Sequence, residues 1–214
     1  MAKEAVLGIV ISVCVAMIVF AIAWYRYEQK RNRETQREIS DRDLLRLLND
    51  QPDKLLSPHQ LRDLTGLSLG KARGRLSSLF MYGILNRSSN SRGRHFYGFK
   101  HPLEEEPDLP LSSDPFLTVE DLLQIFEVHD QRVSAQELIM ATGLPLAVIK
   151  REMKYFEKQG IVQKLQRADA MGTMTSRFFV LQEPYRSNPN LFREKASVLN
   201  LEMRELLRND NLLV

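Results

Sequence analysis

Two stretches of the chain, residues 41–100 and 118–183, share one pattern of apolar and turn residues at a displacement of 77 positions. We call them the first and second repeat. The matched positions include Thr65-Gly66-Leu67 with Thr142-Gly143-Leu144 and Gly83-Ile84 with Gly160-Ile161. Solenoid units have shorter periods of about 20–50 residues. The displacement therefore predicts two duplicated domains rather than a stacked array.

Each repeat carries the local signals of three helices followed by a β-hairpin. A first helix is expected at about 41–50 and 118–129. The second begins at Ser57-Pro58-His59-Gln60 or at Ser134-Ala135-Gln136-Glu137, where a capping Ser is followed three residues later by Gln or Glu. An amphipathic third helix follows Gly66 or Gly143, and short β-forming runs come after it. The predicted fold class is mainly α with small β-hairpins, that is, α+β.

Two short helices joined by a glycine turn, the second of them amphipathic, form a helix-turn-helix, and the hairpin that follows corresponds to a wing. Each repeat thus resembles a winged helix-turn-helix domain of bacterial transcriptional regulators. The residues that carry the resemblance are Gly66-Leu67-Ser68, Ala72-Arg73-Gly74-Arg75-Leu76, Leu79 and Gly83-Ile84-Leu85. The resemblance implies binding to double-stranded DNA, although the same domain also serves as a protein-binding module.

The first repeat contains the stronger DNA-binding pattern, with 11 Lys and Arg against 5 Asp and Glu. If Ala72, Leu76 and Leu79 face the core, the rest of the third helix faces solvent. A helix fits the major groove and a basic hairpin fits the adjacent backbone. The candidate DNA-binding residues are Lys71, Arg73, Arg75 and Ser78 on the helix and Arg87, Arg92 and Arg94 on the hairpin.

The same helix face of the second repeat is less basic. It offers Lys150, Arg151 and Lys154 as a secondary contact with DNA or protein, beside an expected exposed Val148. The hairpin tip, Met171-Gly172-Thr173-Met174-Thr175, is uncharged. We therefore leave open whether this repeat contacts DNA or protein.

The amino-terminal residues differ from the repeats. Ala5 to Tyr25 are 21 residues without a charge, enough for a helix to cross a hydrocarbon core of about 30 Å. Basic residues follow, so we expect a single-pass anchor at residues 1–25 in the inner (plasma) membrane, with the amino terminus outside and the domains cytoplasmic. A polar helical stalk is expected at 26–40. The alternative is a signal peptide cleaved after Ala21-Ile22-Ala23.

Two further segments lie outside the repeats. Residues 101–117 are acidic and rich in proline, which predicts an extended linker. In the tail, 184–214, a helix from Asn188-Pro189 to about Arg208 would carry the apolar stripe Phe192, Ala196, Leu199, Met203 and Leu206. The stripe suggests a homodimer through the tail, to which small residues Gly8, Ser12 and Ala16 of the membrane helix would contribute. Packing of the stripe on the second repeat is the alternative.

Several functional classes are not indicated. A single cysteine, Cys14, excludes an intramolecular disulfide and a Cys-rich zinc site. The four histidines have no metal-ligand spacing, and no nucleophile is accompanied by a base and an orienting residue. We expect no enzyme, cofactor, metal or small-molecule substrate. The sequence favours a membrane-anchored, DNA-binding transcriptional regulator, and the alternative is a membrane-tethered adaptor whose tandem winged helices bind protein.

Overall fold

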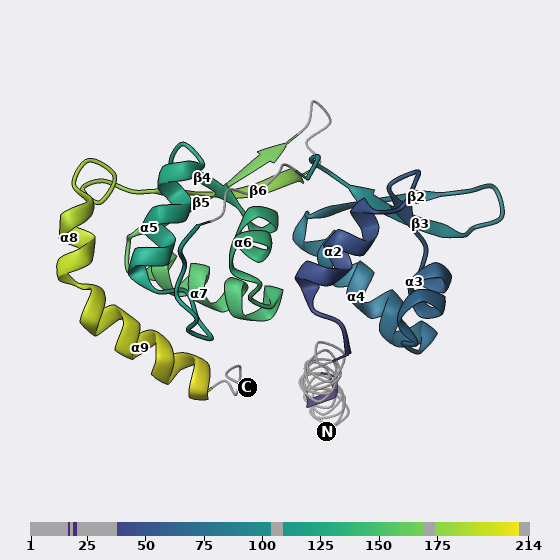
Figure 1. Cartoon of the computed structure of the whole chain (residues 1–214), viewed down its shortest axis with the longest axis horizontal. Coiled ribbons are helices and arrows are strands. Elements are labelled where there is room, and N and C mark those ends of the chain that lie inside the picture. The colour runs from purple at the N-terminus through teal and green to yellow at the C-terminus, as the bar shows by residue number, and fades with distance from the viewer. Residues whose placement is uncertain (1–16, 18, 21–37, 104–108, 169–173, 210–214) are drawn as a thin grey trace, which may run out of the picture.

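The computed structural model describes residues 17, 19–20, 38–103, 109–168 and 174–209. Within them the chain is α+β, with eight helices and two three-stranded antiparallel sheets. The two repeats form two lobes that lie side by side, the first on the right and the second on the left in Figure 1.

In the first repeat a two-residue strand and the two strands of a hairpin form one small sheet. β3 lies between β1 and β2 and is antiparallel to both. In chain order the elements are α2 (Asp41–Asn49), β1 (Leu55–Leu56), α3 (Pro58–Thr65), α4 (Leu69–Tyr82), β2 (Leu85–Ser89) and β3 (His95–Phe99).

The second repeat has the same order of elements and the same sheet topology, with β6 between β4 and β5. Its elements are α5 (Val119–Val128), β4 (Arg132–Ser134), α6 (Ala135–Thr142), α7 (Leu146–Lys158), β5 (Val162–Ala168) and β6 (Met174–Leu181). The starts of α6, α7 and β5 each lie 77 residues after those of α3, α4 and β2. The displacement seen in the sequence is therefore preserved in the backbone.

The predicted helix starts and stops are confirmed. The side chains of Ser57 and Gln60 form a reciprocal capping box at the start of α3, and Ser134 and Glu137 do the same at α6. Gly66 and Gly143 end these helices in the left-handed conformation, with φ of 75° and 70°. A side chain at these φ values is strained, so glycine fixes the turn between the second and third helices.

Each repeat contains one strand that its sequence does not predict. β1 contains two residues and β4 three, and such short strands show no alternation of apolar and polar residues. Their position depends on partners elsewhere in the chain: Leu55 lies opposite Gly98 on β3. A Cβ atom at Gly98 would lie 2.9 Å from Leu55 Cδ2 and 3.2 Å from the Lys54 carbonyl oxygen, so the absence of a side chain there allows β1 to approach.

The end of the predicted linker is part of the second repeat. Phe116 and Leu117 are buried, and the backbone and hydroxyl of Ser112 both donate to the Asp121 carboxylate on α5, at 2.7 and 2.5 Å. The acidic residues 104–108 lie outside the described part of the chain. Only residues 101–103 and 109–117 of the predicted linker can therefore be placed.

The tail also packs on the second repeat. It forms two helices, α8 (Pro189–Glu194) and α9 (Ala196–Asn209), which run along the outer and lower edge of that lobe in Figure 1. Arg193 donates two hydrogen bonds to Glu120, and the Asn200 side chain accepts from the Val119 amide at the start of α5. The first amides of a helix have no acceptor within that helix. The Asn200 side chain of the tail supplies the acceptor for the Val119 amide.

The apolar stripe that suggested a dimer is buried within the chain. Phe192, Leu199 and Met203 are at most 6% exposed, and α9 contacts both α5 and α7. The alternative, packing on the second repeat, is the arrangement that the structure has. The predicted single helix is also divided, because α8 ends at Glu194 and α9 begins at Ala196.

We expect Leu199→Ala to lower the free energy of unfolding by about 2 kcal/mol, because it removes a buried side chain and leaves a cavity. Leu201→Ala is the matched control, since Leu201 lies on the same helix but is 61% exposed. That substitution is expected to change the free energy by no more than about 0.5 kcal/mol. Urea denaturation of both variants measures the difference, and equal losses would contradict the packing described here.

The expected fold class requires one correction. A membrane-spanning helix was predicted at residues 5–25, but no helix among the described residues is long and apolar enough to cross a membrane. Of that segment only Met17, Val19 and Phe20 are described, and the stalk predicted at 26–40 is described only from Glu38. The fold class of the described chain is α+β without a membrane helix. No described residue tests the expected localisation.

Candidate nucleic-acid interface

The core face of α4 is as predicted, since Ala72, Leu76 and Leu79 are buried. Arg75, however, is only 3% exposed. Its guanidinium donates to Asp41 Oδ1 at 2.6 Å and to the Ile39 carbonyl oxygen at 3.0 Å. The interpretation of Arg75 as a solvent-facing DNA contact is therefore wrong. With 3.6 residues per turn, position 75 lies on the same face as 72 and 79, at the edge of the core stripe, and its side chain reaches the segment before α2.

Asp41 connects the two repeats. It is 4% exposed, and its second oxygen, Oδ2, accepts a hydrogen bond of 2.8 Å from the Leu146 amide at the first turn of α7. The residue before that turn is Pro145, and no side chain of the second repeat caps the helix. A carboxylate at a helix amino terminus is favoured by the unpaired amides and by the helix dipole. Asp41 of the first repeat thus caps the third helix of the second.

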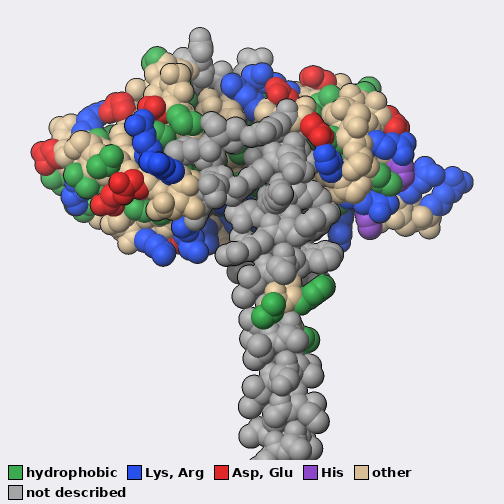
Figure 2. Space-filling view, turned by 90° about the horizontal axis from the view of Figure 1, so that it is seen from below, with side chains coloured by type: hydrophobic (Ala, Val, Ile, Leu, Met, Phe, Trp, Pro, Cys, Tyr) green, Lys and Arg blue, Asp and Glu red, His purple; other side chains and the backbone are tan. Residues whose placement is uncertain are grey.

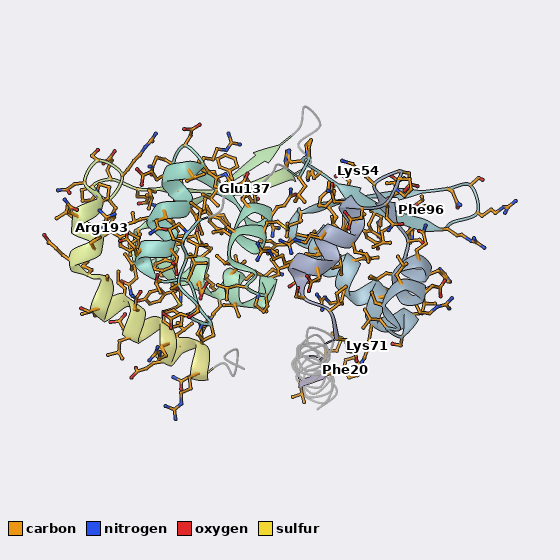
Figure 3. All side chains as sticks on the ribbon, viewed as in Figure 1. Phe20, Lys54, Lys71, Phe96, Glu137 and Arg193 are labelled. Atoms are coloured by element: carbon orange, nitrogen blue, oxygen red, sulfur yellow. The ribbon has the colours of Figure 1, made fainter. Side chains whose placement is uncertain are left out.

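The other predicted residues of α4 are more accessible. Arg73 is exposed, whereas Lys71 and Ser78 are half-buried. Lys71 Nζ forms an ion pair of 2.6 Å with Glu38, in which the two side chains are 27% and 43% exposed. Pairs this exposed contribute about 0–1 kcal/mol, so Glu38 does not prevent Lys71 from binding another anion. Figure 3 shows Lys71 on the lower side of the first lobe.

The hairpin formed by β2 and β3 projects from the right end of the first lobe in Figure 1, and its three predicted arginines, Arg87, Arg92 and Arg94, are exposed. Its tip is held by Asn90, whose side-chain oxygen accepts from the amides of Arg92 and Arg94 at 3.0 and 2.9 Å. The Arg87 guanidinium carbon lies 4.9 Å from the centre of the Phe80 ring on α4. Figure 2 shows Lys and Arg side chains gathered at this end of the molecule.

The corresponding face of the second repeat is mostly covered. Val148, expected to be exposed, is 2% exposed, and Tyr155 is buried and hydrogen-bonded to Glu202 of α9. Lys150 and Arg151 are half-buried, and Lys154 is exposed. The prediction of an exposed apolar contact at Val148 is therefore wrong. Of the three predicted secondary-contact residues only Lys154 is freely accessible to solvent.

Glu152 on α7 is fully buried and occupies the position equivalent to Arg75, 77 residues later. Its Oε1 accepts a hydrogen bond of 2.9 Å from the Leu117 amide, and Oε2 has no hydrogen-bond partner. Burial raises the pKa of Glu152 to about 8 because it penalises the charged carboxylate, although the Leu117 amide lowers it. In each repeat a buried charged residue, Arg75 or Glu152, thus hydrogen-bonds the third helix to the segment that precedes the first helix.

The site contains no grouping suited to metal chemistry in the part of the chain that the structure describes, where no three His, Cys, Asp or Glu side chains are placed to hold an ion. No protein-family model matches the sequence, and no curated protein matches it. The geometry of the residues is therefore the basis for assigning a function.

Proposed function

We propose that the protein is a DNA-binding transcriptional regulator whose first repeat, a winged helix-turn-helix, contacts double-stranded DNA. The proposal rests on one observation above all: four arginines, Arg73, Arg87, Arg92 and Arg94, are exposed on α4 and the adjoining hairpin. Phosphate contacts by Arg and Lys dominate the affinity of proteins for DNA. A helix and a basic hairpin together match a groove and its flanking backbone.

The start of α4 is open at Gly70, as far as the described residues extend. Gly70 is exposed, and a Cβ atom placed on it would have no other atom within 4 Å. Gly70 lies one turn before Arg73, so the backbone of α4 can be approached closely beside this cation. Lys71 adds a second cation once it exchanges Glu38 for a phosphate, which the weakness of an exposed ion pair permits.

The second repeat serves a different role in this proposal. The first turn of α7 is capped by Asp41 of the first repeat, and α9 packs on the same helix. To enter a major groove, α7 would have to lose both the Asp41 cap of the first repeat and the covering helix α9 of the tail. We therefore assign the second repeat to holding the first in position, with Lys154 as the remaining accessible cation of the predicted secondary contact.

The test compares two double variants of the full-length chain that change the net charge equally. R92E/R94E reverses two exposed arginines at the hairpin tip, and R186E/R208E reverses two exposed arginines outside the proposed interface. We expect the hairpin variant to bind duplex DNA at least about tenfold more weakly at about 0.1 M salt, with a salt slope smaller by about 2. Fluorescence anisotropy with a labelled duplex over a range of salt concentrations measures both quantities.

The control variant R186E/R208E is expected to bind within about threefold of the unmodified protein, since its charges are far from the hairpin. Equal losses in both variants would show that only net charge matters and would remove the hairpin from the interface. An unmodified protein that does not bind duplex DNA even at low salt would contradict the proposal and favour the adaptor.

A further inference from the structure

An aromatic side chain on α4 holds an arginine of the adjoining hairpin. The guanidinium carbon of Arg87 lies over the Phe80 ring, 4.9 Å from its centre. Phe80 is in the last turn of α4, and Arg87 lies in the middle of β2. The two elements of the proposed DNA interface therefore meet at this contact.

The Phe80 ring is itself fixed by the neighbouring strand. Tyr97 on β3 is 4% exposed, and its ring meets the Phe80 ring edge-on, with the two centroids 6.4 Å apart and the planes at 71°. Tyr97 is also the cross-strand partner of Arg87, so these two side chains lie on the same face of the sheet. Arg87 is thus held against a ring whose position is set by the core.

The stacked arginine keeps its charge and its donors. Arg87 is exposed, and no carboxylate among the residues that the structure describes forms an ion pair with it. A guanidinium that lies over a ring uses its flat face, so the N–H groups at its edge stay available. Those N–H groups match the oxygens of a phosphate.

The ring also places Arg87 in line with a second cation. Phe80 comes seven residues after Arg73, which is close to two helical turns, so both lie on one edge of α4 about 10 Å apart along its axis. Arg73 is exposed. The Phe80 ring therefore brings the hairpin arginine to the edge of the helix that already carries an arginine.

The second repeat lacks this arrangement. The positions 77 residues later are occupied by Glu157 on α7 and Lys164 on β5. A ring holds a cation without neutralising it, whereas a nearby carboxylate offsets its charge. The pair of an aromatic ring and an arginine thus belongs to the repeat whose exposed arginines support the proposed function.

We propose that Phe80 is a positioning residue that orients Arg87 toward a phosphate of the DNA backbone, between the contacts of α4 and those of the hairpin tip. Without the ring, Arg87 has to lose side-chain freedom when it binds, and ordering one long side chain weakens binding by about two- to tenfold. The assignment rests on the function proposed above. The stacking itself is measured without DNA, so the two can fail separately.

The test is a double-mutant cycle on the full-length chain, in which fluorescence anisotropy measures the affinity for a labelled duplex at about 0.1 M salt. F80L keeps an apolar side chain but removes the ring, and we expect it to weaken binding about fivefold. R87Q is expected to weaken binding by at least as much and to reduce the salt slope by about 1. In the R87Q background, F80L is expected to change the affinity by less than about twofold, because no arginine is left to orient.

Two variants serve as controls. F80Y retains the face of the ring and is expected to bind within about twofold of the unmodified protein. F96L makes the same change as F80L at Phe96, which Figure 3 labels on the hairpin and which faces the opposite side of the sheet from Tyr97. It is also expected to keep its affinity. Equal losses from F80L with and without Arg87 would show that Phe80 only supports the fold, and equal affinities of F80L and F96L would overturn the assignment as well.

Proton NMR of the protein without DNA separates this assignment from the proposed function. The ring current of Phe80 shifts the signals of the Arg87 side chain, and F80L is expected to remove that shift. If the shift is present but the unmodified protein binds no duplex DNA at low salt, the stacked pair exists, and both the function and the role of Phe80 in it are wrong. If the protein binds DNA but shows no such shift, the function stands and only the role of Phe80 is wrong.

Discussion

Replacing Asp41 by Ala is expected to lower the free energy of unfolding by about 3–5 kcal/mol, the usual cost of leaving one partner of a buried ion pair uncompensated. The variant leaves the Arg75 guanidinium, 3% exposed, with only the Ile39 carbonyl oxygen, and it removes the acceptor of the Leu146 amide. Urea denaturation monitored by circular dichroism measures the loss.

The matched control is Asp63→Ala. Asp63 pairs with the neighbouring Arg62 at 2.7 Å, but its side chain is 61% exposed. This substitution is expected to cost less than about 1 kcal/mol because the pair is screened by solvent. A loss below 1 kcal/mol for Asp41→Ala would mean that Arg75 is not paired as described and would restore it as a candidate DNA contact.

Glu152→Gln is expected to stabilise the protein, and increasingly so as the pH rises. The folded-state pKa of Glu152 is about 8, above the ordinary value of 4.5, so folding takes up a proton. The associated stability is fully present below about pH 4.5 and is lost as the pH rises through about 8. Between pH 5 and 8 the unmodified protein should lose about 3–4 kcal/mol relative to the glutamine variant, which has no charge to bury.

Urea denaturation of both proteins at pH 5 and pH 8 tests this expectation. Glu205→Gln serves as control, since Glu205 is exposed on α9. Its stability should follow that of the unmodified protein at both values. A constant difference between Glu152→Gln and the unmodified protein would mean that Glu152 remains ionised when the protein folds.

Features that depend on neighbouring residues were predictable from the sequence. The capping boxes at Ser57 and Ser134 and the glycine ends at Gly66 and Gly143 are each made within one helical turn. The exposure of Arg87, Arg92 and Arg94 was predictable for the same reason, because a hairpin tip has few partners other than solvent. These signals do not depend on how the two repeats pack.

Features that depend on distant partners were not predictable. Arg75 was placed on the solvent face because it is charged, and Glu152 was not singled out, although helical periodicity puts both on the core side of their helices. Their partners are 34 to 36 residues away in the sequence. Asp41, which caps α7, is 105 residues away from Leu146, whose amide donates the hydrogen bond. No local pattern marks Asp41 for that role.

Arg75 and Glu152 carry opposite charges at equivalent positions. This difference disfavours the docking of the third helix of one repeat into the other repeat. Tandem copies with similar backbones are prone to misassembly during folding, in which an element of one copy docks into the other. If α7 replaced α4 against α2, Asp41 would lose its cation and would face a second carboxyl group, while Arg75 would leave both its acceptors behind. Each third helix is therefore matched to the segment before its own first helix, and the exchanged pairing is disfavoured.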